Sequence, residues 1–196
     1  MRPIPAILIL AAGASARMRG ADKLLQDIDG TPLILRATRA ACAVSPEVIV
    51  ALPPASPRRL WLTDTPARLI EVEDRAMSAS IRAGLAACTR DALMIHLADM
   101  PEIGAAEMQM LADAWTTSKS RTARAATEDG RPGQPVIFAR PLFPALAELT
   151  GDTGAKPLLR KESPDVIRLP GQAAITDLDT PESWAAWHAA RRRDVP

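Results

Sequence analysis

A loop of small residues, flanked by two basic side chains, follows the first apolar run of the chain. The segment ILILAAGASARMRGADK ends at Lys23, and its small residues Ala11, Ala12 and Gly13 stand where the apolar run ends. Residues without bulk let a backbone approach a ligand closely, and successive N–H groups there can form a concave anion site. Because Arg17 and Lys23 add positive charge, this loop predicts a cradle for a triphosphate.

Two well-known phosphate-binding loops do not fit this segment. A dinucleotide-binding fingerprint that starts at Gly13 would need glycines at the places of Ser15 and Met18. A Walker A loop would need a glycine before Lys23 and a serine or threonine after it, where the sequence has Asp22 and a leucine. The missing dinucleotide fingerprint disfavours an oxidoreductase.

Three aspartates follow patterns that suit a metal site. Asp99 comes shortly after the apolar segment 92–97, at the carboxyl end of an expected strand, where open α/β sheets bind ligands. Asp177 and Asp179 are two residues apart, so an extended chain points both side chains the same way. Mg²⁺ takes one or two carboxylates together with phosphate oxygens. We therefore expect Asp99 as the first magnesium ligand and prefer Asp177 over Asp179 as the second. The alternatives are a strand-end turn and a helix-start cluster.

Apolar runs that suit strands alternate along the chain with segments that suit helices. This alternation is typical of a layered α/β domain, and we expect one domain over residues 1–196. The unbroken apolar run before the glycine loop is typical of a central strand buried on both faces of a parallel sheet. We expect strands at 4–10, 47–52, 68–72, 92–97, 136–139 and 166–169, and helices at 31–43, 77–87, 104–117, 142–149 and from 181 to 191–193.

Several polar residues define the expected boundaries of these elements. Thr31, Ser78 and Thr180 are expected to cap the starts of helices, as hydroxyl side chains do. Residues 118–133 are polar and basic and end in a cluster of glycine and proline. We expect them to form a loop or a strand-loop arm near the ligand.

The composition favours a small-molecule partner. The net charge of +1 disfavours a nucleic-acid binder, because affinity for a phosphate backbone requires many clustered Lys and Arg. Cys42 and Cys88 are isolated from one another and are expected to be buried free thiols in a reducing compartment. The N-terminal segment has the pattern of neither a signal peptide nor a membrane span. We therefore expect a cytoplasmic protein without a membrane partner.

The glycine loop resembles the L-A-A-G-x-S-x-R-M-G-x-x-K signature of the MobA/MocA-like nucleotidyltransferases, which are related to molybdenum cofactor guanylyl- and cytidylyltransferases. The matching residues are Leu10, Ala11, Ala12, Gly13, Ser15, Arg17, Met18 and Lys23. Arg19 is inserted before Gly20, so this loop is one residue longer than the signature. The resemblance covers nearly the whole chain, since its elements occur in family order.

Further segments extend the resemblance. Asp99 lies in A-D-M-P where the family has G-D-M-P, and D-L-D-T-P-E around Asp177 and Asp179 resembles the family's second metal-contact element. Ser78 and Ser80 lie in a segment that the family uses for the nucleoside. The residues expected by resemblance to bind the acceptor are Gly133 and Gln134, in place of a G-H-P element, and Gly154 and Lys156, in a G-D-T-G-A-K segment that includes Thr153. A plain turn is the alternative for this last segment.

The resemblance implies a Rossmann-like three-layer α/β fold with a mostly parallel mixed sheet. It also implies a Mg²⁺-dependent transfer of a nucleotide from a nucleoside triphosphate to the terminal phosphate of molybdopterin, with release of pyrophosphate. L-A-A-G loops accompany cytidylyl transfer in this family, so Ala12 favours CTP over GTP. Neither His96 nor His188 is given a catalytic role, because an acceptor phosphate with a second pKa of about 6 is already an anionic nucleophile.

In this reading Leu10, Ala11, Ala12, Gly13, Lys23, Ser78 and Ser80 bind the nucleotide, and Arg17, Lys23 and Asp99 carry the catalysis. Two alternatives stay open. The acceptor could be a sugar or polyol phosphate, or the protein could be a noncatalytic nucleotide-binding or cofactor-delivery partner of a molybdenum hydroxylase.

Overall fold

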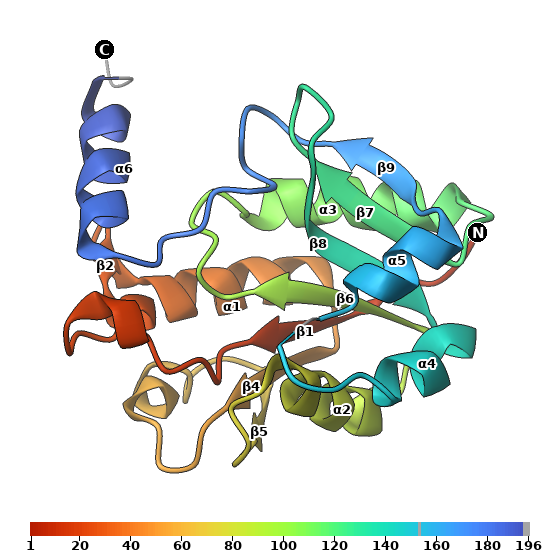
Figure 1. Ribbon diagram of the computed structural model, residues 1–196, viewed down its shortest axis with the longest axis horizontal. Helices are drawn as coiled ribbons and strands as arrows, with labels where there is room; N and C mark the ends of the chain where they lie inside the picture. The colour runs from red at the N-terminus through yellow and green to blue at the C-terminus, as the bar shows by residue number, and fades with distance from the viewer. Residues whose placement is uncertain (153, 194–196) are drawn as a thin grey trace.

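A mixed β-sheet between two layers of helices forms the centre of the molecule (Figure 1). The computed structural model describes residues 1–152 and 154–193, and within these ranges the main sheet has seven strands in the order β5-β4-β1-β6-β8-β7-β9. Its strands are β1 (Ala6–Leu10), β4 (Val48–Leu52), β5 (Arg68–Glu71), β6 (Ala92–Leu97), β7 (Thr122–Ala126), β8 (Pro132–Ala139) and β9 (Asp165–Arg168). The helices are α1 (Leu33–Val44), α2 (Met77–Ala87), α3 (Ala105–Thr117), α4 (Phe143–Ala147), α5 (Lys156–Glu162) and α6 (Pro181–Arg193).

Most neighbouring strands of the sheet run parallel. β1 pairs in parallel with both β4 and β6, β5 pairs in parallel with β4, and β9 pairs in parallel with β7. Only β8 runs against its two neighbours, β6 and β7, within the described part of the sheet. The mostly parallel mixed sheet in three layers confirms the expected fold class.

The central strand β1 is buried on both faces, as its unbroken apolar sequence predicted. Ile7 and Ile9 belong to the core beneath α1 and α3, whereas Leu8 belongs to the core beneath α2, α4 and α5. Gly84 lets α2 lie close to β1, since a Cβ built there would be 2.3 Å from a methyl carbon of Leu8. The strand is therefore held from both sides, which fixes the position of the loop that follows it.

The ends of β1 and β6 lie side by side at one edge of the sheet. Leu10 is opposite Leu97 in the parallel register, and the N–H of Ala98 donates to the carbonyl of Leu10 at 3.3 Å. The glycine loop after β1 and Asp99 after β6 consequently emerge next to each other, as expected for the carboxyl ends of parallel strands.

Two expected helix caps are wrong. Thr31 and Pro32 form the short strand β3, which pairs with β2 (Asp27–Ile28), and α1 begins only at Leu33. The N–H of Leu33 donates to the carbonyl of Gln26, so the hairpin takes the residues that were expected to start the helix. Ala76, and not Ser78, holds the capping position of α2, and the first N–H of the helix, that of Met77, donates instead to the Asp152 carboxylate at 2.9 Å.

Residues 118–133 contain more regular structure than the sequence predicted. β7 occupies 122–126, and β8 starts at Pro132, earlier than the expected 136. The backbone pairs here although β7 consists of small and polar residues, which carry a weak apolar pattern. The Gly/Pro cluster lies where β7 and β8 meet, with a register shift between Arg124 and Ala126.

The last helix, α6, begins as expected. The N–H of Ser183 donates to the Thr180 hydroxyl oxygen at 3.1 Å, which confirms Thr180 as its cap. Trp184 and Trp187 pack into the core next to α1 and α3, and Trp187 Nε1 donates to Glu102 at 2.9 Å. None of the helices in the described ranges is long and apolar enough to cross a membrane.

Candidate functional site

The glycine loop presents free backbone donors at the edge of the sheet. The N–H of Ala11 continues the sheet by donating to the carbonyl of Ala51 at 3.1 Å. The N–H groups of Ala12, Gly13 and Ala14 find no acceptor among the described residues. A Cβ built on Gly13 would have no atom within 4 Å, so neighbouring atoms leave room for a ligand at this glycine.

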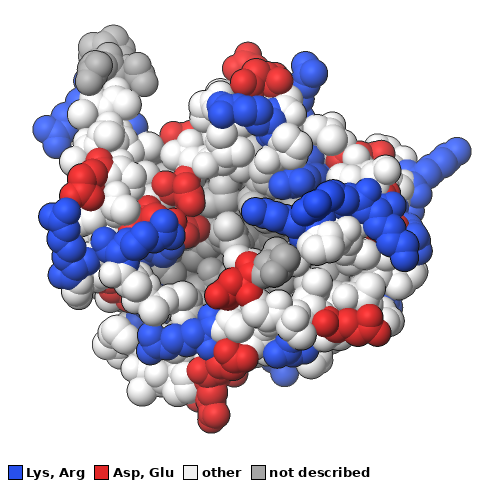
Figure 2. All heavy atoms as spheres, in the orientation of Figure 1, with Lys and Arg blue, Asp and Glu red and all other residues white. Residues whose placement is uncertain are grey.

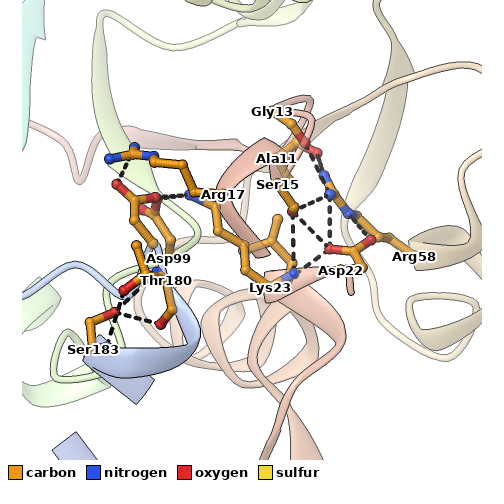
Figure 3. Close-up of polar contacts among 12 residues, drawn as sticks. Ala11, Gly13, Ser15, Arg17, Asp22, Lys23, Arg58, Asp99, Thr180 and Ser183 are labelled. Atoms are coloured by element: carbon orange, nitrogen blue, oxygen red, sulfur yellow. Dashed lines mark hydrogen bonds and ion pairs between the residues drawn. The ribbon is translucent and has the colours of Figure 1, made fainter. Parts of the chain in front are cut away.

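A buried arginine that the sequence analysis missed holds this loop from the other side. Arg58 is 4% exposed, and its guanidinium donates to the carbonyls of Ala11 at 2.5 Å and Gly13 at 3.0 Å. It also forms a two-pronged ion pair with Asp22, at 2.7 and 2.9 Å, and reaches the Ser15 hydroxyl at 3.3 Å (Figure 3). Arg58 lies in the short 3₁₀ helix Pro57–Trp61, and the sequence offered only a proline-rich turn there.

The contacts of Arg58 determine where the N–H groups of the loop point. In a planar trans peptide the C=O of one residue and the N–H of the next point in opposite directions. Because Arg58 binds the carbonyls of Ala11 and Gly13, the N–H groups of Ala12 and Ala14 point away from Arg58. The loop therefore turns its donors outward as an anion site.

Lys23 lies between two of the predicted aspartates. Its Nζ donates to Asp99 and, at 2.6 Å, to Asp179, while Arg17 pairs with the other oxygen of Asp179 at 2.5 Å. Burial alone would lower the pKa of Lys23, but the charges and hydrogen bonds of Asp99 and Asp179 outweigh it and raise that pKa. Burial likewise opposes ionisation of Asp179, yet Lys23 and Arg17 hold its pKa below the usual value.

The acidic groups of this cluster still lack positive charge. Burial, followed by the charges of Asp179 and Asp99, raises the pKa of Asp177. Asp99 Oδ1 is buried and has no hydrogen-bond partner among the described residues. Surplus carboxylate charge beside an unpartnered oxygen fits a divalent cation. Within the described ranges no three acidic, histidine or cysteine side chains form a complete metal cage, so phosphate oxygens would have to complete the ligand set.

Two adjoining cavities open along this edge of the sheet. The first, of about 320 Å³, contains the glycine loop and the aspartate cluster; it is lined by the predicted residues Leu10, Ala11, Ala12, Gly13, Arg17, Lys23, Ser80, Asp99, Asp177 and Asp179. The second, of about 290 Å³, is lined by the predicted acceptor residues Gly133, Gln134, Gly154 and Lys156. Leu10, Met77, Leu97, Asp152 and Asp177 line both. Figure 2 shows a hollow near the centre of this face, with acidic atoms on its left and lower margins and basic atoms on its right.

Ser78 is not brought to the site. It is 1% exposed and lines neither cavity, and its N–H donates to the carbonyl of Gly151. Ser80, two residues later on α2, lines the first cavity instead. Thr153, in the expected acceptor segment, lies outside the described residues.

Close packing, as well as its place in the second cavity, accounts for a glycine at position 133. A Cβ built there would be 1.9 Å from the backbone oxygen of Ala174, to which the N–H of Gln134 donates at 2.8 Å. Only glycine allows the start of β8 to lie this close to the segment that leads to Asp177.

Solved structures with the same architecture show the fold of this protein, and the match to a family model shows its class. A protein of Mycobacterium tuberculosis, Rv0371c, superposes with a TM-score of 0.80 at 25% identity, covering 94% of this chain and 98% of that one. A nucleotidyl transferase from Methanothermobacter shares the fold, with a TM-score of 0.78 at 17% identity, over 97% and 99% of the two chains. The chain is a nucleotidyltransferase with the Rossmann-like fold of these proteins.

The family is narrower than this class. The sequence profile of the MobA-like NTP transferase domain matches residues 7–166, and the chain belongs to that family. A protein of Synechococcus elongatus named probable molybdenum cofactor guanylyltransferase is 28% identical over 92% of this chain and 96% of its own length. The bifunctional protein GlmU of Kineococcus radiotolerans is 34% identical over 56% of this chain, which spans only 24% of that relative. The same mycobacterial protein Rv0371c has also been solved in complex with manganese.

Proposed function

We propose that this protein transfers a nucleoside monophosphate from a magnesium-bound nucleoside triphosphate to the terminal phosphate of a molybdopterin-type acceptor. The observation that carries the proposal is the first cavity, where free loop N–H groups lie near three aspartates whose charge Lys23 and Arg17 compensate only in part. A triphosphate would accept from the free loop N–H groups, and a divalent ion would compensate the surplus charge of the aspartates. The manganese complex of the similar mycobacterial protein supports a divalent ion.

The proposed roles follow the two cavities. Leu10, Ala11, Ala12, Gly13 and Ser80 bind the nucleotide, and Arg17 and Lys23 neutralise its phosphates. Asp99 holds the metal with Asp177, or with Asp179 in its place, and Gly133, Gln134, Gly154 and Lys156 bind the acceptor. Magnesium, when bound, offsets charge on the phosphate oxygens. Asp177 lines both cavities, so the reacting groups would meet beside it.

The proposed reaction is an in-line displacement. An oxygen of the acceptor phosphate attacks the α-phosphorus, a new P–O bond forms, and the bond from that phosphorus to the leaving pyrophosphate breaks. Positioning and charge neutralisation supply most of the rate in phosphoryl-type transfers. His96 is fully buried, and its pKa of about 3 leaves it neutral, so this reading requires no histidine base.

The nucleotide is proposed to be CTP. The support is Ala12, which is 3% exposed in the first cavity and resembles the loop of cytidylyltransferases. GTP is the second candidate, because the related Synechococcus protein is named a guanylyltransferase.

The molybdopterin-type acceptor is supported by the relatives named molybdenum cofactor guanylyltransferases. A cytoplasmic location and delivery of the product to a molybdenum hydroxylase are part of the same proposal. A noncatalytic role would keep nucleotide binding without release of pyrophosphate. Measuring pyrophosphate in the presence of the acceptor therefore separates an enzyme from a delivery protein.

Thermal unfolding with each of the four ribonucleoside triphosphates, with and without magnesium, tests the nucleotide site. At a hundred times its Kd, a ligand stabilises by about 2.7 kcal/mol, or roughly 5–10 °C in Tm for a chain of this size. We expect that shift with CTP and magnesium and its loss in Asp99→Asn. Gly13→Ala should unfold at the wild-type Tm without nucleotide, because its Cβ enters open space, and should also lose the shift.

Asp113→Asn, an exposed change on α3, is the matched control and should keep the full shift. A shift of equal size without magnesium, or in Asp99→Asn, would contradict the proposed site. A larger shift with GTP than with CTP would move the assignment to guanylyl transfer.

A further inference from the structure

The second cavity contains a cation that neither the sequence signature nor the proposed roles use. Arg124, on β7, lines this cavity together with Gly133 and Lys156. Val136 lies opposite Arg124 in the antiparallel register and lines the same cavity. Residues directly opposite each other in a sheet project from the same face, so Arg124 projects from the cavity face.

The side chain of Arg124 is oriented but not neutralised. Its Nε donates to the carbonyl of Gly133 at 2.9 Å, which holds the guanidinium at the cavity. Among the described residues Arg124 forms no ion pair, whereas neighbouring Arg121 pairs with Glu162 at 2.6 Å. Burial lowers the pKa of Arg124, yet an arginine stays charged at neutral pH. A partly buried cation without a carboxylate is costly unless a ligand supplies an acceptor.

The remaining walls of the cavity are mainly apolar. They include Leu10, Met77, Ile81, Ile95, Leu97, Met100, Val136, Phe138, Leu159 and Ile175. Beside Arg124 and Asp177, the polar side chains of the cavity are Gln134, Asp152 and Lys156. A polyol with many hydroxyl groups would exceed these partners, and each unpartnered group costs free energy. A flat or apolar body fits these walls, with polar groups only at its ends.

The two polar ends of the cavity, Asp177 and Arg124, lie beside different strands of the sheet. Asp177, at the border with the nucleotide cavity, lies near the end of β6, because the N–H of Leu178 donates to the carbonyl of Asp99. Arg124 lies on β7, and β8 separates it from β6. Neighbouring strands are 4.7–4.9 Å apart, which places Arg124 about 10 Å from β6 across the sheet. Arg124 is level with Ile95, because both lie opposite Val136, so the two ends of the cavity are also offset along the strands.

We infer that Arg124 determines acceptor specificity by binding an electronegative group, a ring carbonyl or an anion, at the end of the acceptor opposite its phosphate. This inference rests on the proposed function for the position of the phosphate. It selects an acceptor that is at least about 10 Å long and has a flat or apolar body, and it disfavours sugar and polyol phosphates.

Calorimetric titration of two probes tests the inference. Neopterin monophosphate carries a flat ring with a carbonyl opposite its phosphate, and ribitol phosphate carries only hydroxyl groups. We expect the wild-type protein to bind the pterin more tightly than the polyol. Arg124→Met should weaken pterin binding by at least about tenfold, as expected for the loss of a charged hydrogen bond, with ribitol phosphate binding unchanged.

The controls separate this inference from the proposed function. Arg168→Met, the same change on the exposed edge strand β9, should bind both probes as the wild type does. Magnesium–CTP affinity should be equal in the wild type and Arg124→Met, since Arg124 does not line the nucleotide cavity. Absence of triphosphate binding in the wild type would overturn the proposed function and leave the pterin result standing.

Three outcomes would overturn the inference. Arg124→Met could bind the pterin as tightly as the wild type does, or the wild type could bind ribitol phosphate more tightly than the pterin, or the wild type could fail to bind the pterin. Arg124→Gln is the second variant if Arg124→Met does not fold. It keeps a donor for the Gly133 carbonyl and removes the charged end of the side chain with its other donors, so the same weakening of pterin binding is expected.

Discussion

Single buried charges orient the nucleotide side of the site. Arg58 binds two carbonyls of the glycine loop and is neutralised by Asp22, while Lys23 is neutralised by Asp99 and Asp179. Removing one member of such a pair leaves the other buried without compensation, which costs more than the pair contributes. These charges therefore fix the geometry of the loop more strongly than they stabilise the fold.

Arg58→Lys should weaken nucleotide binding although residue 58 acts only through the glycine loop and does not contact the nucleotide. A lysine is a point charge that cannot bond both carbonyls and both oxygens of Asp22 at once. We expect the affinity for the magnesium–nucleotide complex to fall by at least about tenfold, equivalent to about 1.4 kcal/mol. The free energy of unfolding should fall by about 1–3 kcal/mol. Calorimetry at a temperature where the variant is fully folded measures the affinity, and urea titration the stability.

The neighbouring change Arg59→Lys serves as the control. The side chain of Arg59 is 40% exposed and pairs with Glu71 at 2.7 Å, away from the glycine loop, so its replacement should leave nucleotide affinity unchanged. Wild-type nucleotide affinity in folded Arg58→Lys would show that the loop keeps its shape without this arginine.

The sequence predicted the site residues that flank apolar runs and missed those that act across the fold. Gly13, Lys23 and Asp99 follow strands whose apolar pattern is plain, so their common edge was predictable. Arg58 reaches carbonyls 45 and 47 residues away, and no local pattern marks such a contact. Ser78 was expected at the nucleotide because it is a hydroxyl residue near a helix start, but buried serines that face the core occur at such positions too.

At the scale of elements, β6 carries a histidine whose burial makes the fold sensitive to acid. His96 is fully buried on the same face of the sheet as Met94, and neither ring nitrogen has a hydrogen-bond partner among the described residues. Burial lowers the pKa of His96 to about 3. The ring is therefore neutral in the folded protein at every pH near neutrality.

His96→Leu should remove part of the acid sensitivity of the protein. In the unfolded chain a histidine has a pKa of about 6.5, so below that pH the unfolded state binds a proton that the folded state does not. Stability is therefore lost as the pH falls from about 6.5 toward 3. Between pH 7 and pH 5 the wild type should lose about 2 kcal/mol through His96, and the variant should not.

Urea titrations at pH 8, 7 and 5 measure this difference. The stability gap between the wild type and His96→Leu should be the same at pH 8 and pH 7, where the histidine is mostly neutral in both states. A gap that is also unchanged at pH 5 would contradict neutral burial of His96.

Elements with strong apolar patterns were predicted well, and those held by tertiary contacts were not. β1, β4 and β6 match their expected ranges within about two residues because they consist of long aliphatic runs. β7 is built from small and polar residues and pairs because β8 and β9 flank it. The β2–β3 hairpin took Thr31 and Pro32 from the expected helix, since two-residue strands leave no periodicity to read.

At the scale of the whole molecule, the C-terminal segment returns across the sheet and completes the site. Its backbone is joined to β8 by the bond from Gln134 N to the Ala174 carbonyl, and to the end of β6 by the bond from Leu178 to Asp99. Asp177 lies between these two attachments, and Asp179 directly follows the second. The position of both carboxylates therefore depends on how closely this segment lies against β8.

Gly133 lines the second cavity, but Gly133→Ala should also disturb the metal-binding aspartates of the first cavity. A methyl group at Gly133 would be 1.9 Å from the backbone oxygen of Ala174, so the C-terminal segment has to shift. We expect a loss of about 1–3 kcal/mol in the free energy of unfolding. We also expect a smaller magnesium-dependent Tm shift with nucleotide.

Gly13→Ala provides the comparison, because its methyl group enters open space and should leave stability unchanged. Thermal unfolding of both variants without ligand separates packing from ligand approach. Equal stability of Gly133→Ala and the wild type would show that the C-terminal segment can move away without cost.

This return of the chain has a consequence for how the protein is made. Synthesis proceeds from the N-terminus, so the glycine loop, Arg58 and Asp99 leave the ribosome before Asp179 does. Until the residues after Leu178 emerge, Lys23 has only one of its two carboxylate partners and Arg17 has none of those seen here. A nascent chain can thus build the sheet early, and it acquires a balanced reaction centre only when its last segment folds back.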